Sequence, residues 1–197
     1  MLSGKIHTFK WENQMKKIVL ILADGFEELE AVTTIDILRR AGIQVEVMGL
    51  RNTHLTGSRG VTIICDDIFD YYSALEYDGV VMVGGMDNAT RLSEEESVLN
   101  LLKSYLEKNK LIAGICATPA LVFTKAGILE GKTATCYPSD SFINNMDGEY
   151  VDEACVVCDN IITSQSPDTA MEFALTIVQY LGYDAGAVYS ELQGKRS

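Results

Sequence analysis

Short, almost wholly apolar segments alternate along this chain with longer segments of helical spacing, and this alternation constrains the fold more than any other feature. Apolar runs of strand length lie at 18–23, 79–83 and 111–115. A strand that is apolar on both faces has to be covered on both sides, as in the parallel sheets of α/β proteins. The 197 residues suit one such domain. We therefore expect a single α/β domain with a mostly parallel sheet and helices on both faces.

Turn residues and helix signals divide the rest of the chain into elements. Helical spacing predicts helices at 28–41, 93–109, 118–126 and 167–181, with Ser93 and Glu96 forming a capping box at the start of the second. Further strands are expected at 45–50, 61–65 and 133–136, and in the region 155–164 with a turn at Asp159-Asn160. No internal repeat or linker is evident. We assign the domain to residues 15–197 and interpret residues 1–14 as an N-terminal extension, from a tag or an upstream start.

The net charge and the cysteine content limit which partners and which cellular compartment we expect. The chain has 28 acidic and 16 basic residues and a net charge of −12, which repels phosphate backbones and anionic lipid, so neither nucleic acid nor a membrane is an expected partner. The apolar runs are too short to cross a bilayer, and the N-terminus lacks the apolar region of a secretory signal. Five cysteines, an odd number, are expected to be reduced thiols in a cytoplasmic protein.

The chemistry is expected at the carboxyl ends of the strands, where ligands bind in such sheets. There the segment 113–119 takes a buried strand directly into Cys116 and then into a helix. Small residues at Gly114 and Ala117 permit the tight backbone of a nucleophile elbow, and a helix N-terminus favours the thiolate. The alternative is a buried, inert cysteine. The strand-cysteine-helix setting favours a reactive thiol.

Two other segments reach the same edge. Gly84-Gly85 follows the strand at 79–83, and the amides of Gly85 and Ala117 are candidates for an oxyanion hole. Glu27, Glu28 and Glu30 follow the first strand, and one of them is a candidate to share a proton with the thiol. The other two are expected to be solvated acids at a helix N-terminus, and spacing alone does not choose among the three.

Histidine and the remaining cysteines exclude other chemistries. The two histidines, His7 and His54, both precede Cys116, so a Cys-His-Asp triad and a zinc site are not expected. Cys155 and Cys158 have CxxC spacing but no second metal-binding pair, and we interpret them as structural. The proposed chemistry requires neither a cofactor nor a metal.

Taken together, the motifs GFEELEAVTTIDILRRAG, SRGV, GG after a strand, AGICATPALV and TSQSPDTAMEFAL resemble the DJ-1/ThiJ/PfpI superfamily. The similarity covers residues 15–183 and is greatest to the branch of the parkinsonism-associated protein deglycase and its bacterial relatives. It implies a flavodoxin-like, doubly wound fold and a homodimer. It further implies the roles of six residues: a reactive Cys116, a protonated Glu30 bonded to its sulfur, oxyanion-hole amides at Gly85 and Ala117, and anion-binding arginines at Arg40 and Arg59.

The activities that this resemblance implies are glutathione-independent glyoxalase, deglycase, chaperone and peroxide sensor. Some members place a histidine beside the cysteine, where this chain has Tyr137 as a site-lining residue. We therefore expect an enzyme acting on reactive carbonyls through a Cys116 hemithioacetal, with methylglyoxal or glycated amines and thiols as substrates. The alternative is a non-enzymatic oxidative-stress sensor or redox-regulated chaperone that uses Cys116 oxidation.

Overall fold

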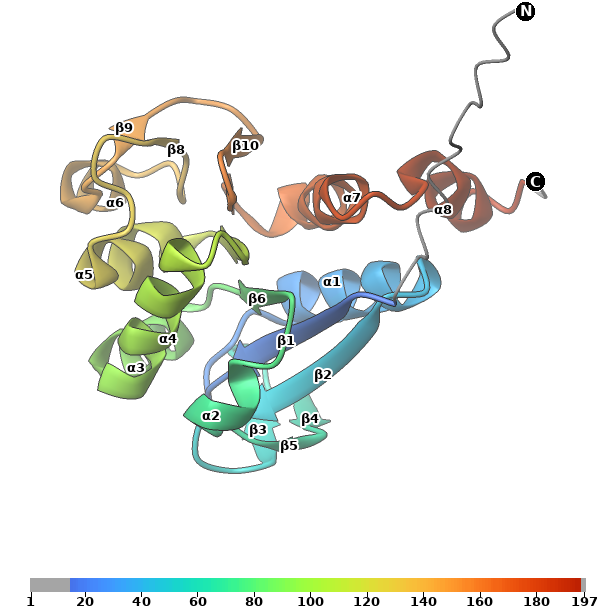
Figure 1. Cartoon of the computed structure of the whole chain (residues 1–197), viewed down its shortest axis with the longest axis horizontal. Coiled ribbons are helices and arrows are strands. Elements are labelled where there is room, and N and C mark those ends of the chain that lie inside the picture. The colour runs from blue at the N-terminus through green and yellow to red at the C-terminus, as the bar shows by residue number, and fades with distance from the viewer. Residues whose placement is uncertain (1–14, 196–197) are drawn as a thin grey trace, which may run out of the picture.

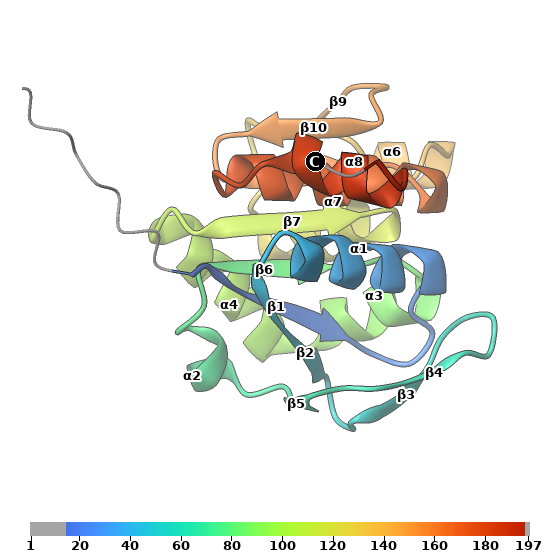
Figure 2. The same cartoon turned by 90° about the vertical axis from the view of Figure 1, so that its right-hand side faces the viewer.

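A central seven-stranded sheet organises residues 15–195, the part of the chain that the computed structural model describes (Figures 1 and 2). Its strands lie in the spatial order β10 (Cys155–Cys158), β11 (Ile161–Ser164), β7 (Leu111–Ile115), β6 (Gly79–Met82), β1 (Lys17–Leu22), β2 (Gln44–Gly49) and β5 (Asp67–Ile68). All neighbouring pairs are parallel except β10 with β11. The mostly parallel sheet expected from the apolar runs is confirmed. The N-terminal extension at 1–14 lies outside the described residues.

Helices cover both faces of this sheet, which confirms the doubly wound arrangement. Figure 2 shows one layer in front, made of α1 (Glu28–Arg40), α7 (Ala170–Tyr180) and α8 (Ala185–Leu192). The layer on the other face contains α3 (Met86–Glu94), α4 (Glu96–Glu107), the π-helical η1 (Pro119–Phe123) and α5 (Thr124–Ala126). Shorter helical elements are α2 (Tyr71–Ala74), α6 (Asp140–Asn145) and η2 (Pro167–Thr169).

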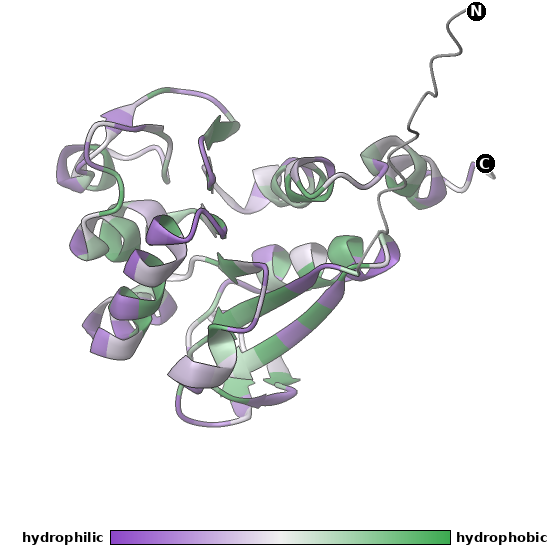
Figure 3. Cartoon of the chain, in the orientation of Figure 1, coloured by the Kyte–Doolittle hydropathy of each residue, from purple (hydrophilic) through white to green (hydrophobic). Residues whose placement is uncertain are grey.

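The core is the sheet itself, as the apolar runs require. Ile18 to Leu22 of β1 are completely buried, and all of β6 and β7 is buried too. The hydropathy colouring of Figure 3 shows the strand β1 as green and the outer helices as mixed. Each buried Leu, Ile or Val side chain contributes roughly 1.5–3 kcal/mol relative to exposure, so these strands supply much of the stability of the core. No helix among residues 15–195 combines the length and the apolarity that crossing a bilayer requires.

The single helix expected at 93–109 is wrong. Two helices, α3 and α4, meet at Glu95, whose backbone is extended (φ −91°, ψ 108°). Ser93 is not a cap: it lies buried inside α3, and its hydroxyl donates to the carbonyl of Thr90 at 2.8 Å. The helix before the break escaped the sequence analysis because Asp87, Asn88 and Thr90 give it a largely polar composition and low helix propensity.

Two of the expected strands lie outside the central sheet. The segment expected at 61–65 contributes β4 (Thr62–Ile64), which forms a separate antiparallel hairpin with β3 (His54–Thr56). The segment expected at 133–136 contributes β8 (Thr133–Ala134), which pairs only with β9 (Glu149–Tyr150). A propensity for extended backbone does not specify which sheet a strand joins, since pairing depends on distant residues.

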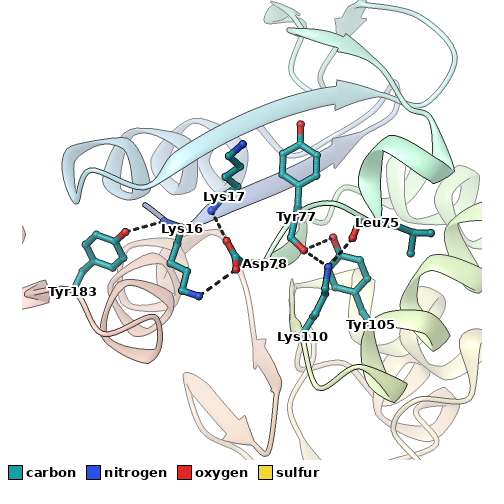
Figure 4. A network of polar contacts seen from close by, with 8 residues as sticks. All are labelled: Lys16, Lys17, Leu75, Tyr77, Asp78, Tyr105, Lys110 and Tyr183. Atoms are coloured by element: carbon teal, nitrogen blue, oxygen red, sulfur yellow. Dashed lines mark hydrogen bonds and ion pairs between the residues drawn. The ribbon is translucent and has the colours of Figure 1, made fainter. Parts of the chain in front are cut away.

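The amino ends of the central strands are fastened by a network of polar contacts (Figure 4). The Asp78 carboxylate accepts from the backbone amide of Lys17 at 2.8 Å and from Lys16 Nζ at 3.1 Å, and the Lys16 amide donates to the Tyr183 hydroxyl at 3.0 Å. Lys110 Nζ donates to two backbone carbonyls of the segment before β6. The loops that carry Cys116 and the glutamates lie at the opposite, carboxyl ends of these strands.

Candidate active site

Cys116 lies on a strained turn at the carboxyl end of β7. Its φ of 64° is in the left-handed region, which a residue with a Cβ rarely adopts. The turn is held by the amide of Cys116, which donates to the carbonyl of Ser164 at 2.9 Å, and a helical segment runs from 117 to 126. The residue is only 9% exposed. The sulfur is therefore lifted to the end of the sheet, with access for small molecules alone.

The double glycine after β6 allows the backbone to pack directly against this sulfur. A Cβ at Gly84 would lie 2.5 Å from the Cys116 Cβ, and one at Gly85 would lie 2.1 Å from the carbonyl oxygen of Gly25. Gly85 also has a φ of 87°. The amides of Gly85 and Ala117 donate toward the Cys116 sulfur. These two positions thus place N–H donors where charge on the sulfur, or on an oxygen bound next to it, can be stabilised.

Glu30 brings a carboxyl group to the same point from α1. It is 0% exposed, and its Oε2 accepts from the amide of Gly84 at 2.6 Å. The Cys116 sulfur and this Oε2 both lie 2.9 Å from the place that a Cβ of Gly84 would occupy, so the two groups face each other. Burial raises the pKa of Glu30 to about 8, and the charge of Glu27 adds to this, while the bonds from Gly84 and Cys116 oppose it.

The Cys116 thiol and Glu30 form one coupled pair. Burial, then the charge of Glu30 and its hydrogen bond, raise the pKa of Cys116, whereas the Gly85 and Ala117 amides lower it. The two contributions from Glu30 require an ionised carboxylate. Because burial keeps Glu30 protonated at neutral pH, they vanish there, and a protonated Glu30 can donate to the sulfur instead. The geometry thus supports a neutral Glu30 beside the sulfur, where the two amides and the Glu30 donor favour the thiolate and oppose the effect of burial.

The three neighbouring glutamates occupy different environments. The Glu27 carboxylate caps α1 by accepting from the Glu30 amide at 2.8 Å. Glu28 accepts from the amides of Arg59 at 2.6 Å and Val61 at 3.3 Å, and so attaches α1 to the β3–β4 hairpin. Burial alone would raise the pKa of Glu28, but these amide bonds outweigh burial and lower it. Of the three, the structure brings Glu30 to the sulfur.

The other predicted site residues lie at different distances from this centre. The amide of Tyr137 donates to the Cys116 carbonyl at 2.9 Å, and its ring packs edge-on against Phe142. Arg59 lies in the turn of the β3–β4 hairpin, where its backbone amide donates to Glu28 at 2.6 Å. Arg40 does not join them: it lies ten residues beyond Glu30 on α1, about 15 Å along the axis, and pairs with Asp36 and Glu191.

Two buried side chains beside the double glycine were missed by the sequence analysis. Asn88 and Thr118 both donate to the carbonyl of Val83, each at 2.7 Å. Their signal in the sequence is weak, because a polar residue one turn into a helix is ordinarily solvated. Among residues 15–195, no group of three or more His, Cys, Asp or Glu side chains is placed to hold a metal ion.

Comparison with known proteins shows the family to which the chain belongs. The model of the DJ-1/PfpI family matches residues 16–180. The chain belongs to the DJ-1/PfpI family. Protein dj-1beta of Drosophila melanogaster is 42% identical over 170 residues, covering 84% of this chain and 89% of the relative. The solved structure of oxidised Toxoplasma gondii DJ-1 superposes with a TM-score of 0.84 at 33% identity, over 90% of this chain and 98% of that one.

Membership of the DJ-1/PfpI family confirms the resemblance inferred from the motifs and the flavodoxin-like fold. Protein DJ-1 homolog B of Arabidopsis thaliana is 38% identical over 177 residues, or 89% of this chain. The chain spans about 40% of the length of that relative and of Arabidopsis homolog A. This is a DJ-1-type chain, and the geometry around Cys116 is the basis for its proposed chemistry.

Proposed function

We propose that this DJ-1/PfpI chain is a cysteine-dependent enzyme that converts small reactive carbonyls, with Cys116 as nucleophile and Glu30 as the acid-base group. The observation that carries the proposal is the Glu30 carboxyl, completely buried against the Cys116 sulfur with its pKa raised to about 8 by burial. A carboxyl that keeps its proton at neutral pH beside a nucleophile can both give and take a proton in one reaction.

The reaction begins with the thiolate and a protonated Glu30. Cys116 sulfur attacks the aldehyde carbon of methylglyoxal, a C–S bond forms, and the carbonyl oxygen takes the Glu30 proton to give a hemithioacetal. The amides of Gly85 and Ala117 stabilise the oxyanion as it develops. Glu30, now a carboxylate, removes the hydrogen from the same carbon and returns it to the adjacent one through an enediol. In the enediol a proton passes from the hydroxyl of the first carbon to the oxygen of the second, which gives a lactoyl thioester. Water hydrolyses this thioester: the water oxygen becomes part of the lactate carboxylate, one of its protons returns to Glu30, the other is released to solvent, and the departing sulfur is again a thiolate.

The surroundings of the sulfur favour a small substrate. Cys116 is 9% exposed, so an aldehyde of two or three carbons or an early glycation adduct of an amine or thiol reaches it more readily than a bulky group. The Tyr137 amide donates to the Cys116 carbonyl, and the residue is 41% exposed. Within the described residues 15–195, the Glu30 carboxyl is hydrogen-bonded to the Cys116 sulfur. We therefore assign the proton transfers to and from carbon to Glu30. We further propose that the protein is cytoplasmic.

The direct test is release of lactate from methylglyoxal, without glutathione, by the parent and by Cys116→Ser. Cys136→Ser is the matched control, since Cys136 is also a buried thiol but its sulfur faces the Tyr137 carbonyl. We expect turnover by the parent and the control and none by Cys116→Ser. Equal release by all three proteins would refute the proposal.

Oxidation sensing is the second candidate, and one comparison favours it: the Toxoplasma relative at 33% identity has been solved in an oxidised form. A thiolate beside a carboxyl donor can pass through sulfenic to sulfinic acid. Mass spectrometry after mild peroxide distinguishes the two roles when run beside the lactate assay. Stoichiometric oxidation confined to Cys116 in a chain that releases no lactate would favour the sensor.

A further inference from the structure

Asn88 is a completely buried amide in the first turn of α3, and the chemistry above gives it no role. Its Oδ1 accepts from the amide of Ala23 at 2.7 Å, at the end of β1. Its Nδ2 donates to the carbonyls of Val83 at 2.7 Å and Gly84 at 3.1 Å, at the end of β6. Both N–H donors of the Asn88 side chain thus bond to backbone carbonyls of the double-glycine loop.

Both of these carbonyls have a second donor. The Val83 carbonyl also accepts from Thr118 Oγ1 at 2.7 Å, and the Gly84 carbonyl from the amide of Glu27 at 3.1 Å. Asn88 is the side chain that holds the two carbonyls together. Buried carbonyls with two donors have a fixed direction, since rotation would leave both donors unsatisfied.

The direction of a carbonyl determines the direction of the amide in the same peptide unit. A trans peptide is planar, so its C=O and N–H point to opposite sides. The Val83 carbonyl shares its peptide with the Gly84 amide, which donates to Glu30 at 2.6 Å. The Gly84 carbonyl shares its peptide with the Gly85 amide, which is directed toward the Cys116 sulfur and lowers the pKa of that thiol. The two carbonyls that Asn88 holds therefore aim the two amides that bind the reacting pair.

We propose that Asn88 is a positioning residue that sets the thiolate character of Cys116 by orienting the Gly84 and Gly85 peptide units. The inference rests on the proposed thiolate chemistry of Cys116. Glycines leave these peptides free to rotate, so the side-chain bonds replace the restraint that a Cβ would give. Without them the Gly85 amide turns away, the sulfur loses a donor to its charged form, and the thiol pKa rises.

The test is the rate of Cys116 alkylation by iodoacetamide against pH, followed by mass spectrometry, in folded Asn88→Ala and Asn88→Asp. We expect the apparent pKa of Cys116 to rise by about one unit, with a tenfold lower rate at neutral pH. Asn160→Ala is the control: Asn160 is buried and donates to the Lys110 carbonyl at 2.6 Å, at the other end of the sheet. Its profile should match the parent.

Thr118→Val and Thr118→Ser keep the proposal testable if the Asn88 variants do not fold. Thr118→Val removes one donor to the Val83 carbonyl and should raise the pKa by less, while Thr118→Ser should restore the parent profile. A parent-like profile in every variant that folds would overturn the assignment. Because alkylation needs no carbonyl turnover, a parent that releases no lactate refutes the enzymatic proposal while leaving this measurement decisive for Asn88.

Discussion

Burial and hydrogen-bond partners, rather than residue type, distinguish the glutamates that follow β1. Glu27 caps α1 by accepting from the Glu30 amide, whereas Glu28 accepts from the amides of Arg59 and Val61, which favour its charged form. Glu30, two residues further on, lies completely buried and accepts one amide bond. At the scale of a single residue, burial is what allows the Glu30 carboxyl to remain protonated at neutral pH.

The first prediction concerns Glu30→Gln. Glutamine preserves a donor to the sulfur but cannot carry a proton between carbon atoms, so we expect lactate release to fall by ~10²–10⁴-fold, the usual contribution of a positioned acid-base group. Alkylation of Cys116 should change much less. Glu28→Gln is the control and should retain turnover. Parent-like turnover by Glu30→Gln would show that another group moves the proton.

At the scale of elements, Glu28 joins α1 to the β3–β4 hairpin. Its pKa is lowered from 4.5, because the amide bonds outweigh the effect of burial. A lowered carboxyl pKa stabilises the folded protein at pH values above the unfolded pKa, and this stabilisation is lost as the pH falls through the folded value. The hairpin is therefore held most firmly above pH 4.5 and released in acid.

We accordingly predict that Glu28→Gln destabilises the protein by roughly 1–2 kcal/mol at neutral pH, because charge-assisted hydrogen bonds become neutral ones. Hydrogen exchange at the amides of Arg59 and Val61 should accelerate. The difference in stability from the parent should shrink as the pH is lowered below 4.5. A difference that persists unchanged in acid would mean that the charge of Glu28 is not what holds the hairpin.

The elements that the sequence predicted well are those whose pattern is local. Apolar runs identified β1, β6 and β7, and the Gly84-Gly85 and Cys116 turns follow directly from where those strands end. The break at Glu95 and the separate β3–β4 hairpin were missed because they depend on packing between distant segments. The choice of Glu30 needed the family resemblance, since burial is not visible in the spacing of three glutamates. Asn88 escaped because its partners are backbone groups.

At the scale of the whole molecule, the helical layer of α1, α7 and α8 exposes apolar side chains. Leu29 and Val32 of α1 are 62% and 50% exposed, and Met171 and Tyr189 on the neighbouring helices are also exposed. Exposed apolar side chains on a helical layer are candidates for an association surface. Together with the family resemblance, this layer supports the proposed homodimer.

At this scale we predict that the protein is a dimer and that charged substitutions on the exposed face of α1 dissociate it. Sedimentation equilibrium at micromolar concentration should give about twice the chain mass of 21.6 kDa for the parent and the single-chain mass for Leu29→Glu combined with Val32→Glu. Tyr72→Glu, at a 77% exposed position on α2, is the control and should remain dimeric. A parent that sediments as one chain would contradict the homodimer.

The measurement that tests the central claim most directly is competitive alkylation of all five cysteines in the folded parent as a function of pH. Burial raises the pKa of Cys65, Cys136 and Cys155 to about 11. Burial raises the pKa of Cys116 as well, but its two amide donors and a protonated Glu30 oppose burial by favouring the thiolate. We therefore expect Cys116 to be labelled first, with an apparent pKa below the ordinary thiol value of about 8.5. Labelling of Cys116 that is no faster than that of the other cysteines, or that still increases above pH 9, would contradict the account.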